Sequence, residues 1–176
     1  GHNKSQQTIE YDENIFDYVA KDIPAFPMEA YLTTAQNYIS KVDFELAWTK
    51  FPNQTEDRYT QSWDNINHNL LTHNDFGTQL KRERFLKDEV EQLSAQYSDT
   101  LELIGRAFDI IKSKFIWNGR NSKYVSSTLR EAYKSGSGNC ADINLTLVVL
   151  LRELGLEAYP VLLSTRANGL IHPSHP

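Results

Sequence analysis

The sequence predicts an α+β fold organised around one buried helix. From Ile143 to Leu154 nearly every residue is apolar, which is typical of a helix that is covered on most sides. Residues 99–115 carry apolar side chains at spacings of three and four, as an amphipathic helix does. Residues 37–50 alternate apolar and polar side chains with a period of two, which indicates a half-buried strand, usually of an antiparallel sheet.

The first fifty residues predict β-structure. Residues 8–22 have a strand-like pattern that stops at Pro24 and Pro27. The strand expected over residues 37–50 places its large apolar side chains on one face: Tyr38, Val42, Phe44, Leu46 and Trp48. We therefore assign residues 1–52 to the trailing strands of a preceding β-domain, or to a linker, and residues 53–176 to a separate core.

The pattern then becomes helical. Ser62 is a candidate N-cap for one helix, and Asn74 or Asp75 for a second that carries Phe76, Leu80, Leu86, Val90 and Leu93. The charged residues among these apolar positions are interpreted as a solvated helix face. They are Lys81, Arg82, Glu83, Arg84, Lys87, Asp88 and Glu89.

Three further elements are expected around the central helix. A helix starting at Asp99 should bury Leu101, Ile104, Phe108, Ile111 and Phe115 against it. A turn at residues 117–119, where we read Trp117 as a core residue rather than part of a cleft, leads to a short helix over residues 127–134. Residues 156–165 predict a strand, and Asn168-Gly169 predicts a hairpin whose second strand is barely begun. We therefore expect a core that is truncated at its C-terminal end.

Cys140, the only cysteine, falls on the first turn of the central helix. Asn139 is a good N-cap, Asp142 completes a capping-box pattern, and Gly155 suits a left-handed C-terminal cap. A helix N-terminus favours the reactive thiolate by about 0.3–1 kcal/mol when exposed, which leaves most of the thiol neutral at pH 7. Acyl chemistry would therefore also need a histidine within hydrogen-bond reach of the sulfur.

Composition excludes several function classes. A net charge of −5 with interspersed signs speaks against a general nucleic-acid surface. No apolar run reaches twenty residues, so no membrane span is expected, and one cysteine excludes an internal disulfide. No two histidines have the spacing of a metal site, and we expect no metal and no cofactor. Nothing in the sequence sets the oligomeric state.

The order of these elements resembles the core of the transglutaminase-like superfamily, relatives of papain-fold cysteine enzymes. The resemblance covers residues 99–165 and rests on Gly138-Asn139-Cys140-Ala141-Asp142 together with Leu154-Gly155-Leu156-Glu157-Ala158 after the apolar helix. It implies a helical core in which the cysteine-bearing helix packs on an antiparallel sheet, here truncated. The chain is also similar to a bacterial subgroup in which a β-rich domain precedes this core, which implies an exported or periplasmic protein.

The resemblance also implies roles for individual residues. Cys140 would be the nucleophile of acyl transfer or amide hydrolysis on a protein or peptide, through a thioester. His172 is the candidate base, and His175 a weaker one; both lie among prolines, which suits a loop better than a strand interior. No Asp or Glu follows Glu157, so the family's third member is missing from this sequence. The alternatives are an inactive module that serves binding or scaffolding, and a papain-like peptidase, whose acyl acceptor is water.

Overall fold

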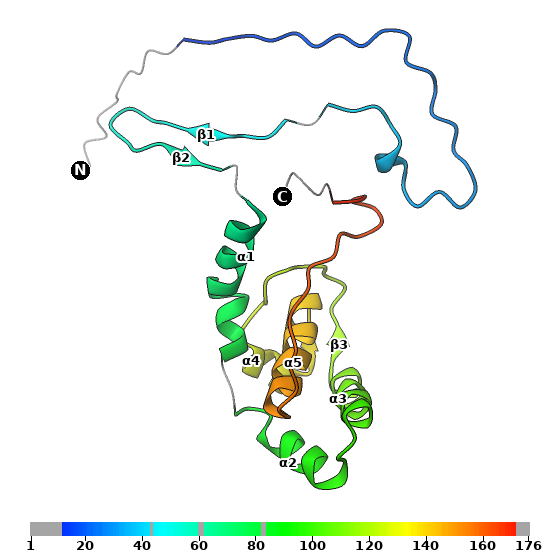
Figure 1. Ribbon diagram of the computed structural model, residues 1–176, viewed down its shortest axis with the longest axis vertical. Helices are drawn as coiled ribbons and strands as arrows, with labels where there is room; N and C mark the ends of the chain where they lie inside the picture. The colour runs from blue at the N-terminus through cyan, green and yellow to red at the C-terminus, as the bar shows by residue number, and fades with distance from the viewer. Residues whose placement is uncertain (1–11, 43, 60–61, 82–83, 172–176) are drawn as a thin grey trace, which may run out of the picture.

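The chain is mixed α+β and consists of a helical body and an extended N-terminal segment (Figure 1). The computed structural model describes residues 12–42, 44–59, 62–81 and 84–171. Helix α5 (Cys140–Glu153) lies at the centre of the helical body, and the other helices surround it. The buried apolar residues form one cluster that spans α5 and its neighbours.

Helix α5 begins and ends as its sequence predicts. Asn139 is the N-cap and forms a capping box with Asp142. At the other end the N–H of Leu156 donates to the carbonyl of Leu151, and the N–H of Gly155 to that of Arg152. This is a Schellman turn, which places Gly155 at a φ of 79° that favours glycine. The buried side of α5 includes Leu145, Val149 and Leu150.

Helix α3 (Thr100–Lys114) packs on α5 with a different face from the one expected. Asp99 caps it as predicted, and Ile111 and Phe115 are buried. Leu101, Ile104 and Phe108 are 78%, 40% and 52% exposed, so the prediction of their burial is wrong. The buried face instead contains Ala107, whose small side chain lets the two helix backbones approach closely.

The helix expected from Asn74 onward is two separate elements. A 3₁₀ helix, η2 (Gly77–Lys81), is followed by α2 (Lys87–Gln96), so the prediction of one continuous helix is wrong. Arg84 lies between them at a φ of 78°, a left-handed conformation that no α-helix can contain. The expected core residues on these elements are nevertheless buried: Phe76, Leu80, Leu86 and Leu93. Helix α1 (Trp63–Thr72) begins at the predicted cap Ser62.

Helix α4 (Leu129–Ser135) is the predicted short helix, and it carries a capping box between Thr128 and Glu131. The Tyr133 hydroxyl on α4 donates to Glu89 of α2 over 2.6 Å. Burial, together with this hydrogen bond to a carboxylate, raises the pKa of Tyr133 well above its usual range. Helix α4 is thereby joined to α2 by a polar contact at the edge of the core.

Two short strands pair beside the start of α5. β3 (Ile116–Trp117) follows α3, β4 (Ser137–Gly138) precedes α5, and they pair in parallel. The sequence predicts no strand at these positions, and the antiparallel sheet expected beside the cysteine helix remains a prediction. Trp117 is 52% exposed, so the interpretation of this residue as part of the core is also wrong. The pair ties the end of α3 to the start of α5.

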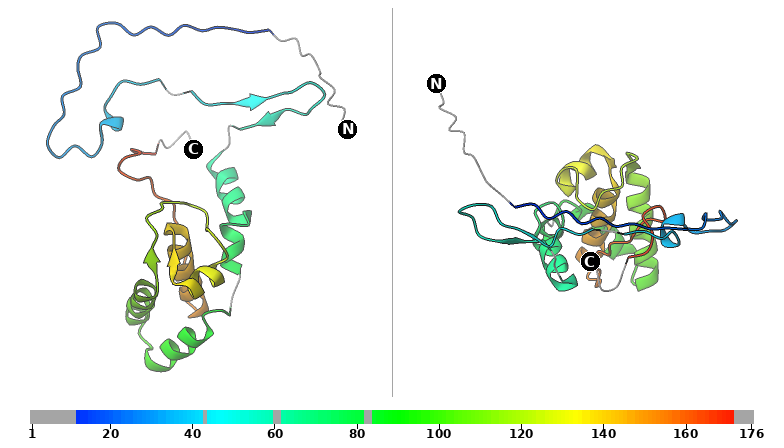
Figure 2. Two further views of the ribbon diagram at one scale, coloured as in Figure 1. Left: turned by 180° about the vertical axis from the view of Figure 1, so that it is seen from behind. Right: turned by 90° about the horizontal axis from the view of Figure 1, so that it is seen from above.

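The N-terminal segment is extended and contains almost no regular structure. Between residues 35 and 58 it has a 3₁₀ helix, η1 (Ala35–Asn37), and an antiparallel pair of β1 (Trp48–Thr49) with β2 (Asp57–Arg58). The predicted strand over residues 37–50 is therefore wrong except at its last residues, and residues 12–22 contain no strand. The reason is that no other described strand lies alongside, and an unpaired strand leaves its backbone groups without partners. Figure 1 and the left view of Figure 2 show this segment beyond the end of the helical body.

The segment after α5 is irregular. Residues 156–165 form no strand, so that prediction is wrong for the same reason. The predicted turn is present: the N–H of Asn168 donates to the carbonyl of Thr165, and Gly169 has a φ of 90°. Figure 1 shows that the segment runs back along α5 toward its N-terminal end. The N–H of Leu170 then donates to Asn37 of η1, which joins this segment to the N-terminal segment.

Candidate active site at the start of helix α5

Cys140 is the first residue of α5 and is partly buried. The capping box fixes its position. The Asp142 N–H donates to Asn139 Oδ1 over 3.0 Å, and the Asn139 N–H donates to Asp142 Oδ2 over 2.8 Å. Both groups would otherwise be unpaired at a helix start. These two hydrogen bonds fix the backbone at residues 139 and 142, on either side of Cys140.

Asp142 also ties the helix start to the loop before α4. Its side chain is fully buried, and its carboxylate accepts the Ser126 N–H at 2.9 Å and the Ser126 hydroxyl at 2.6 Å. The carboxylate packs directly on Gly138: a Cβ there would lie 2.6 Å from the Asp142 Cβ. A buried carboxylate is costly unless it is fully hydrogen-bonded, and these donors provide that.

A loop formed by residues 118–122 covers the polar groups of Cys140. The thiol donates to Asn121 Oδ1 over 3.1 Å, and the Cys140 N–H donates to the Arg120 carbonyl over 3.2 Å. The Trp117 indole N–H donates to the same carbonyl over 3.1 Å. Two N–H donors thus converge on one oxygen beside the sulfur. Such a pair of donors can also stabilise the oxyanion of an acyl-transfer intermediate, if the carbonyl moves away.

Cys140 lines a cavity of about 670 Å³. Helix α5 supplies one wall through Leu147, Val148 and Leu151, and the segment from 158 to 163 supplies another. Asn121, Lys123 and Asn144 are among the polar residues that line it with the cysteine. This volume is in the range of small-molecule sites, so Cys140 lies on the wall of a space that a small substrate group can enter.

The histidines do not complete a site within the described residues. His172 and His175 lie outside them, so their predicted roles remain predictions. Of the described histidines, exposed His68 lies on α1, and His73 accepts the Asp75 N–H and stacks on Tyr124. Neither of these two forms a hydrogen bond to Cys140.

Sequence reasoning did not identify Asn121, Arg120 or Ser126. Asn121 and Arg120 lie about twenty positions before Cys140, and Ser126 lies sixteen before Asp142. No local spacing indicates these contacts, because they arise only when the parallel pair β3–β4 brings the loop to the helix start. Gly138 belongs to the motif that runs to Asp142, but its close contact with the Asp142 side chain depends on the folded backbone.

Within the described ranges, no three His, Cys, Asp or Glu side chains gather where they could hold a metal ion. Across the same residues, none of the helices combines the length and the apolar character that a bilayer crossing requires.

Comparison with known families identifies one similarity. Residues 87–171 match the family model of the Transglutaminase-like superfamily. Cys140, the loop of residues 118–122 and every residue that lines the cavity except Phe76 lie inside the matched region. The matched region is slightly less than half of the chain. No curated protein and no solved structure matches the chain.

Proposed function

We propose that the transglutaminase-like domain carries out acyl transfer or amide hydrolysis through Cys140. One observation supports this most directly. Cys140, in the first turn of α5, lines a cavity of about 670 Å³. Its own N–H and the Trp117 indole N–H converge on the Arg120 carbonyl oxygen. A thiol, an open approach and oxyanion donors are the parts that a cysteine nucleophile needs.

The proposed reaction proceeds through a thioester. A base, for which we propose His172, takes the thiol proton, and the thiolate attacks the carbonyl carbon of a glutamine-type or peptide amide. The N–H groups of Cys140 and Trp117 hold the oxyanion once the Arg120 carbonyl has been displaced. The C–N bond breaks, and ammonia or an amine leaves with the proton from His172. An amine or water then attacks the thioester and regenerates the thiol. With water as acceptor, the same site would act as a peptidase or amidase.

A second candidate function is a binding or scaffolding module that keeps this domain without the chemistry. The specific observation in its favour is that Asn121 accepts a hydrogen bond from the neutral thiol. Among the described residues, neither His68 nor His73 bonds to Cys140. This hydrogen bond stabilises the protonated thiol and so lowers its reactivity.

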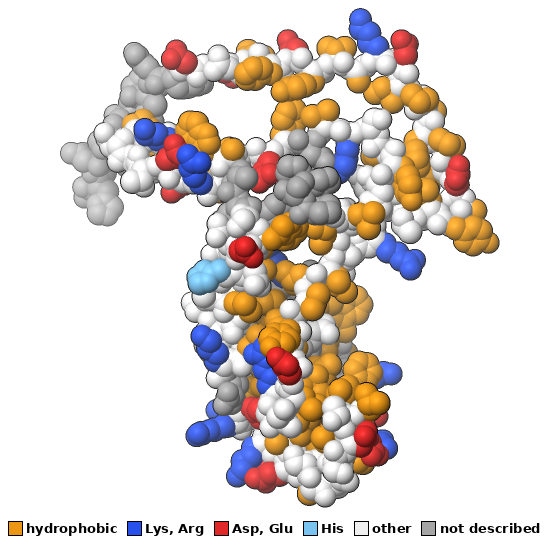
Figure 3. Space-filling view, in the orientation of Figure 1, with side chains coloured by type: hydrophobic (Ala, Val, Ile, Leu, Met, Phe, Trp, Pro, Cys, Tyr) orange, Lys and Arg blue, Asp and Glu red, His pale blue; other side chains and the backbone are white. Residues whose placement is uncertain are grey.

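We also propose that residues 1–52 are the trailing segment of a preceding β-domain, or a linker, and that residues 53–176 form the core. Large apolar side chains along the N-terminal segment are exposed, as Figure 3 shows along the upper part of the molecule. Phe16, Val42 and Phe44 are 74%, 63% and 74% exposed, respectively. A neighbouring domain would bury this surface. By resemblance to the bacterial subgroup we further propose an exported or periplasmic protein that acts on protein or peptide substrates.

Alkylation of Cys140 distinguishes the two functions. The rate of reaction with iodoacetamide is measured from pH 5 to 10 by intact mass, with the Cys140→Ser variant as the unlabelled control. If Cys140 is a catalytic nucleophile, the midpoint of the alkylation rate against pH should lie below the reference thiol pKa of about 8.5. If the domain is a binding module, the thiol should react only after denaturation. The second assay is release of ammonia from a glutamine-containing peptide, which Cys140→Ser should abolish; a variant that retains full release would refute the role of the sulfur.

His172 requires its own test, because its role rests on the resemblance alone. Replacement by Gln should lower the alkylation rate at neutral pH and abolish ammonia release, whereas His175→Gln should change neither. Equal effects of the two substitutions would exclude His172 as the base.

A further inference from the structure

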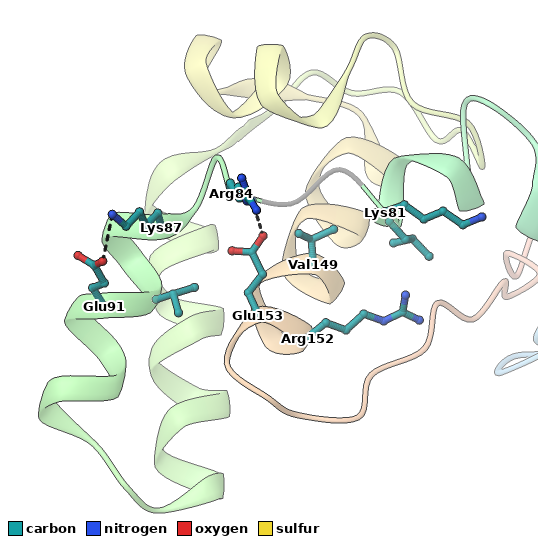
Figure 4. A pocket seen from close by; sticks show the side chains of 9 residues that line it. Lys81, Arg84, Lys87, Glu91, Val149, Arg152 and Glu153 are labelled. Carbon is teal, nitrogen blue, oxygen red and sulfur yellow. Dashed lines mark hydrogen bonds and ion pairs between the residues drawn. The ribbon is translucent and has the colours of Figure 1, made fainter.

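A second cavity lies at the opposite end of α5 from Cys140. It has a volume of about 600 Å³ and is bounded by η2, α2 and the last turn of α5 (Figure 4). Because a helix rises 1.5 Å per residue, about 18 Å separate Cys140 from Arg152 along α5. The two cavities share no lining residue, and the proposed acyl chemistry makes no use of the second one.

The charged side chains around this cavity are predominantly basic. Four cations line it, namely Lys81, Arg84, Lys87 and Arg152, against two carboxylates, Glu91 and Glu153. Both carboxylates already have partners. Glu153 Oε1 accepts the backbone N–H of Arg84 at 2.8 Å, and the Glu91 carboxylate forms an ion pair with the Lys87 ammonium at 3.4 Å. In a chain of net charge −5, the described lining thus carries a local excess of positive charge.

The floor of the cavity is apolar. Leu80 and Val149 are only 6% and 1% exposed, and Val90 lies beside them. Figure 4 shows Val149 in the centre, with Lys81 and Arg152 extending in the same direction. Two cations next to an apolar surface are suited to a ligand that has an anionic end and an apolar body.

Arg152 is held in place before any ligand binds. Its Nε donates to the Ala158 carbonyl over 2.7 Å, and its guanidinium lies over the Tyr159 ring at 5.8 Å. Its two terminal nitrogens form no hydrogen bond or ion pair to any described residue, and their planar arrangement matches phosphate oxygens. A side chain that is already oriented loses less conformational freedom on binding.

We propose that this cavity binds a small phosphate monoester that carries an apolar group. The phosphate would lie between Lys81 and Arg152, and the apolar group on Leu80, Val90 and Val149. A dianionic phosphate also matches the excess of two positive charges around the described lining. The charged residues that we interpreted as a solvated helix face would then form, in part, a ligand site.

The test uses phenyl phosphate as the probe, followed by NMR of the ¹⁵N-labelled chain. Saturable shifts are expected at the amides of residues 84, 87, 152 and 153, with the amides around Cys140 unchanged. Lys81→Met should weaken binding by at least about tenfold. The matched control is Lys112→Met, which removes one exposed positive charge on α3 and should leave the affinity within about twofold.

One further variant and two further probes test the roles of the charge and of the apolar floor. Arg152→Lys retains the charge but loses the planar donor pair, so it should weaken phenyl phosphate and preserve the fold, as judged by the amide spectrum. Inorganic phosphate should bind more weakly than phenyl phosphate because it cannot use the apolar floor, and benzoate should bind more weakly because it carries one charge. Linear shifts without saturation, equal losses in Lys81→Met and Lys112→Met, or equal affinity for inorganic phosphate would each overturn the proposal.

Discussion

The hydroxyl of Ser126 donates to Asp142 Oδ2 over 2.6 Å, and this contact joins the loop before α4 to the first turn of the cysteine helix. The same carboxylate accepts the N–H groups of Ser126 and Asn139. One fully buried side chain therefore holds both the helix start and the loop that leads from Asn121 to α4.

Ser126→Ala should destabilise the fold. The substitution removes the hydroxyl donor of a buried carboxylate, and hydrogen bonds to charged groups contribute about 1.5–3 kcal/mol. We expect a decrease in the free energy of unfolding of about that size, measured by urea denaturation. Ser127→Ala is the matched control, since Ser127 is exposed and makes only a 3.4 Å contact to the Thr128 carbonyl. Its effect should stay within about 0.5 kcal/mol, and an equal loss in both variants would contradict the assignment.

Gly138→Ala should disrupt the site, whereas Gly105→Ala should stabilise the chain. A Cβ on residue 138 would lie 2.6 Å from the Asp142 Cβ and 3.0 Å from its Oδ2, so the carboxylate would have to move. The expected loss is about 2 kcal/mol or more. A Cβ on Gly105, inside α3, meets nothing within 4 Å, so alanine should add about 0.5–1 kcal/mol. Thermal unfolding of both variants measures this, and a neutral Gly138→Ala would mean that Asp142 is not closely packed there.

Asn121→Ala should make Cys140 more reactive. The thiol loses its acceptor, and a hydrogen bond contributes about 1 kcal/mol, so alkylation at pH 7 should accelerate about fivefold. Asn121→Asp should have the opposite effect, because a carboxylate beside the sulfur disfavours the thiolate. Asn67→Ala on the exposed face of α1 is the control. Identical rates in all three variants would show that the loop does not govern the reactivity of the thiol.

The raised pKa of Tyr133 predicts how the free energy of unfolding changes at alkaline pH. Its pKa is raised in the folded state, so the unfolded chain loses this proton first. The stabilisation is complete below the unfolded value of about 10 and is lost as the pH rises beyond it. Tyr133→Phe should therefore show a smaller decrease in the free energy of unfolding between pH 9 and 11 than the parent chain. Tyr31→Phe, at a fully exposed position, should follow the parent curve; if Tyr133→Phe does the same, this interpretation is wrong.

Elements that carry their own end signals could be predicted from the sequence. Ser62, Asp99 and Asn139 are caps at the predicted positions, and Gly155 ends α5 in the left-handed conformation. A cap is a local interaction between residues two or three positions apart, so its pattern in the sequence is sufficient. Because Asn139 is the N-cap, Cys140 is the first residue of α5, as the sequence predicts.

Elements that depend on distant partners could not be predicted in the same way. Residues 37–50 have the pattern of a strand but have no neighbouring strand over most of their length in the part of the chain that the structure describes. On α3 the sequence offers two apolar faces, and only contact with α5 decides that Ala107 rather than Phe108 is buried. The Asn121 contact was likewise beyond prediction, because it needs both α3 and α5 to be in place.

The parallel pair β3–β4 makes the chain between residues 117 and 137 a closed loop. Closing a loop of about twenty residues costs on the order of 3 kcal/mol of chain entropy, which the docking of α3 on α5 helps to offset. The loop that contacts the thiol should therefore form and open together with the contact between these two helices, as one cooperative unit. Amide exchange at residues 118–126 should be slow only for as long as both helices stay together.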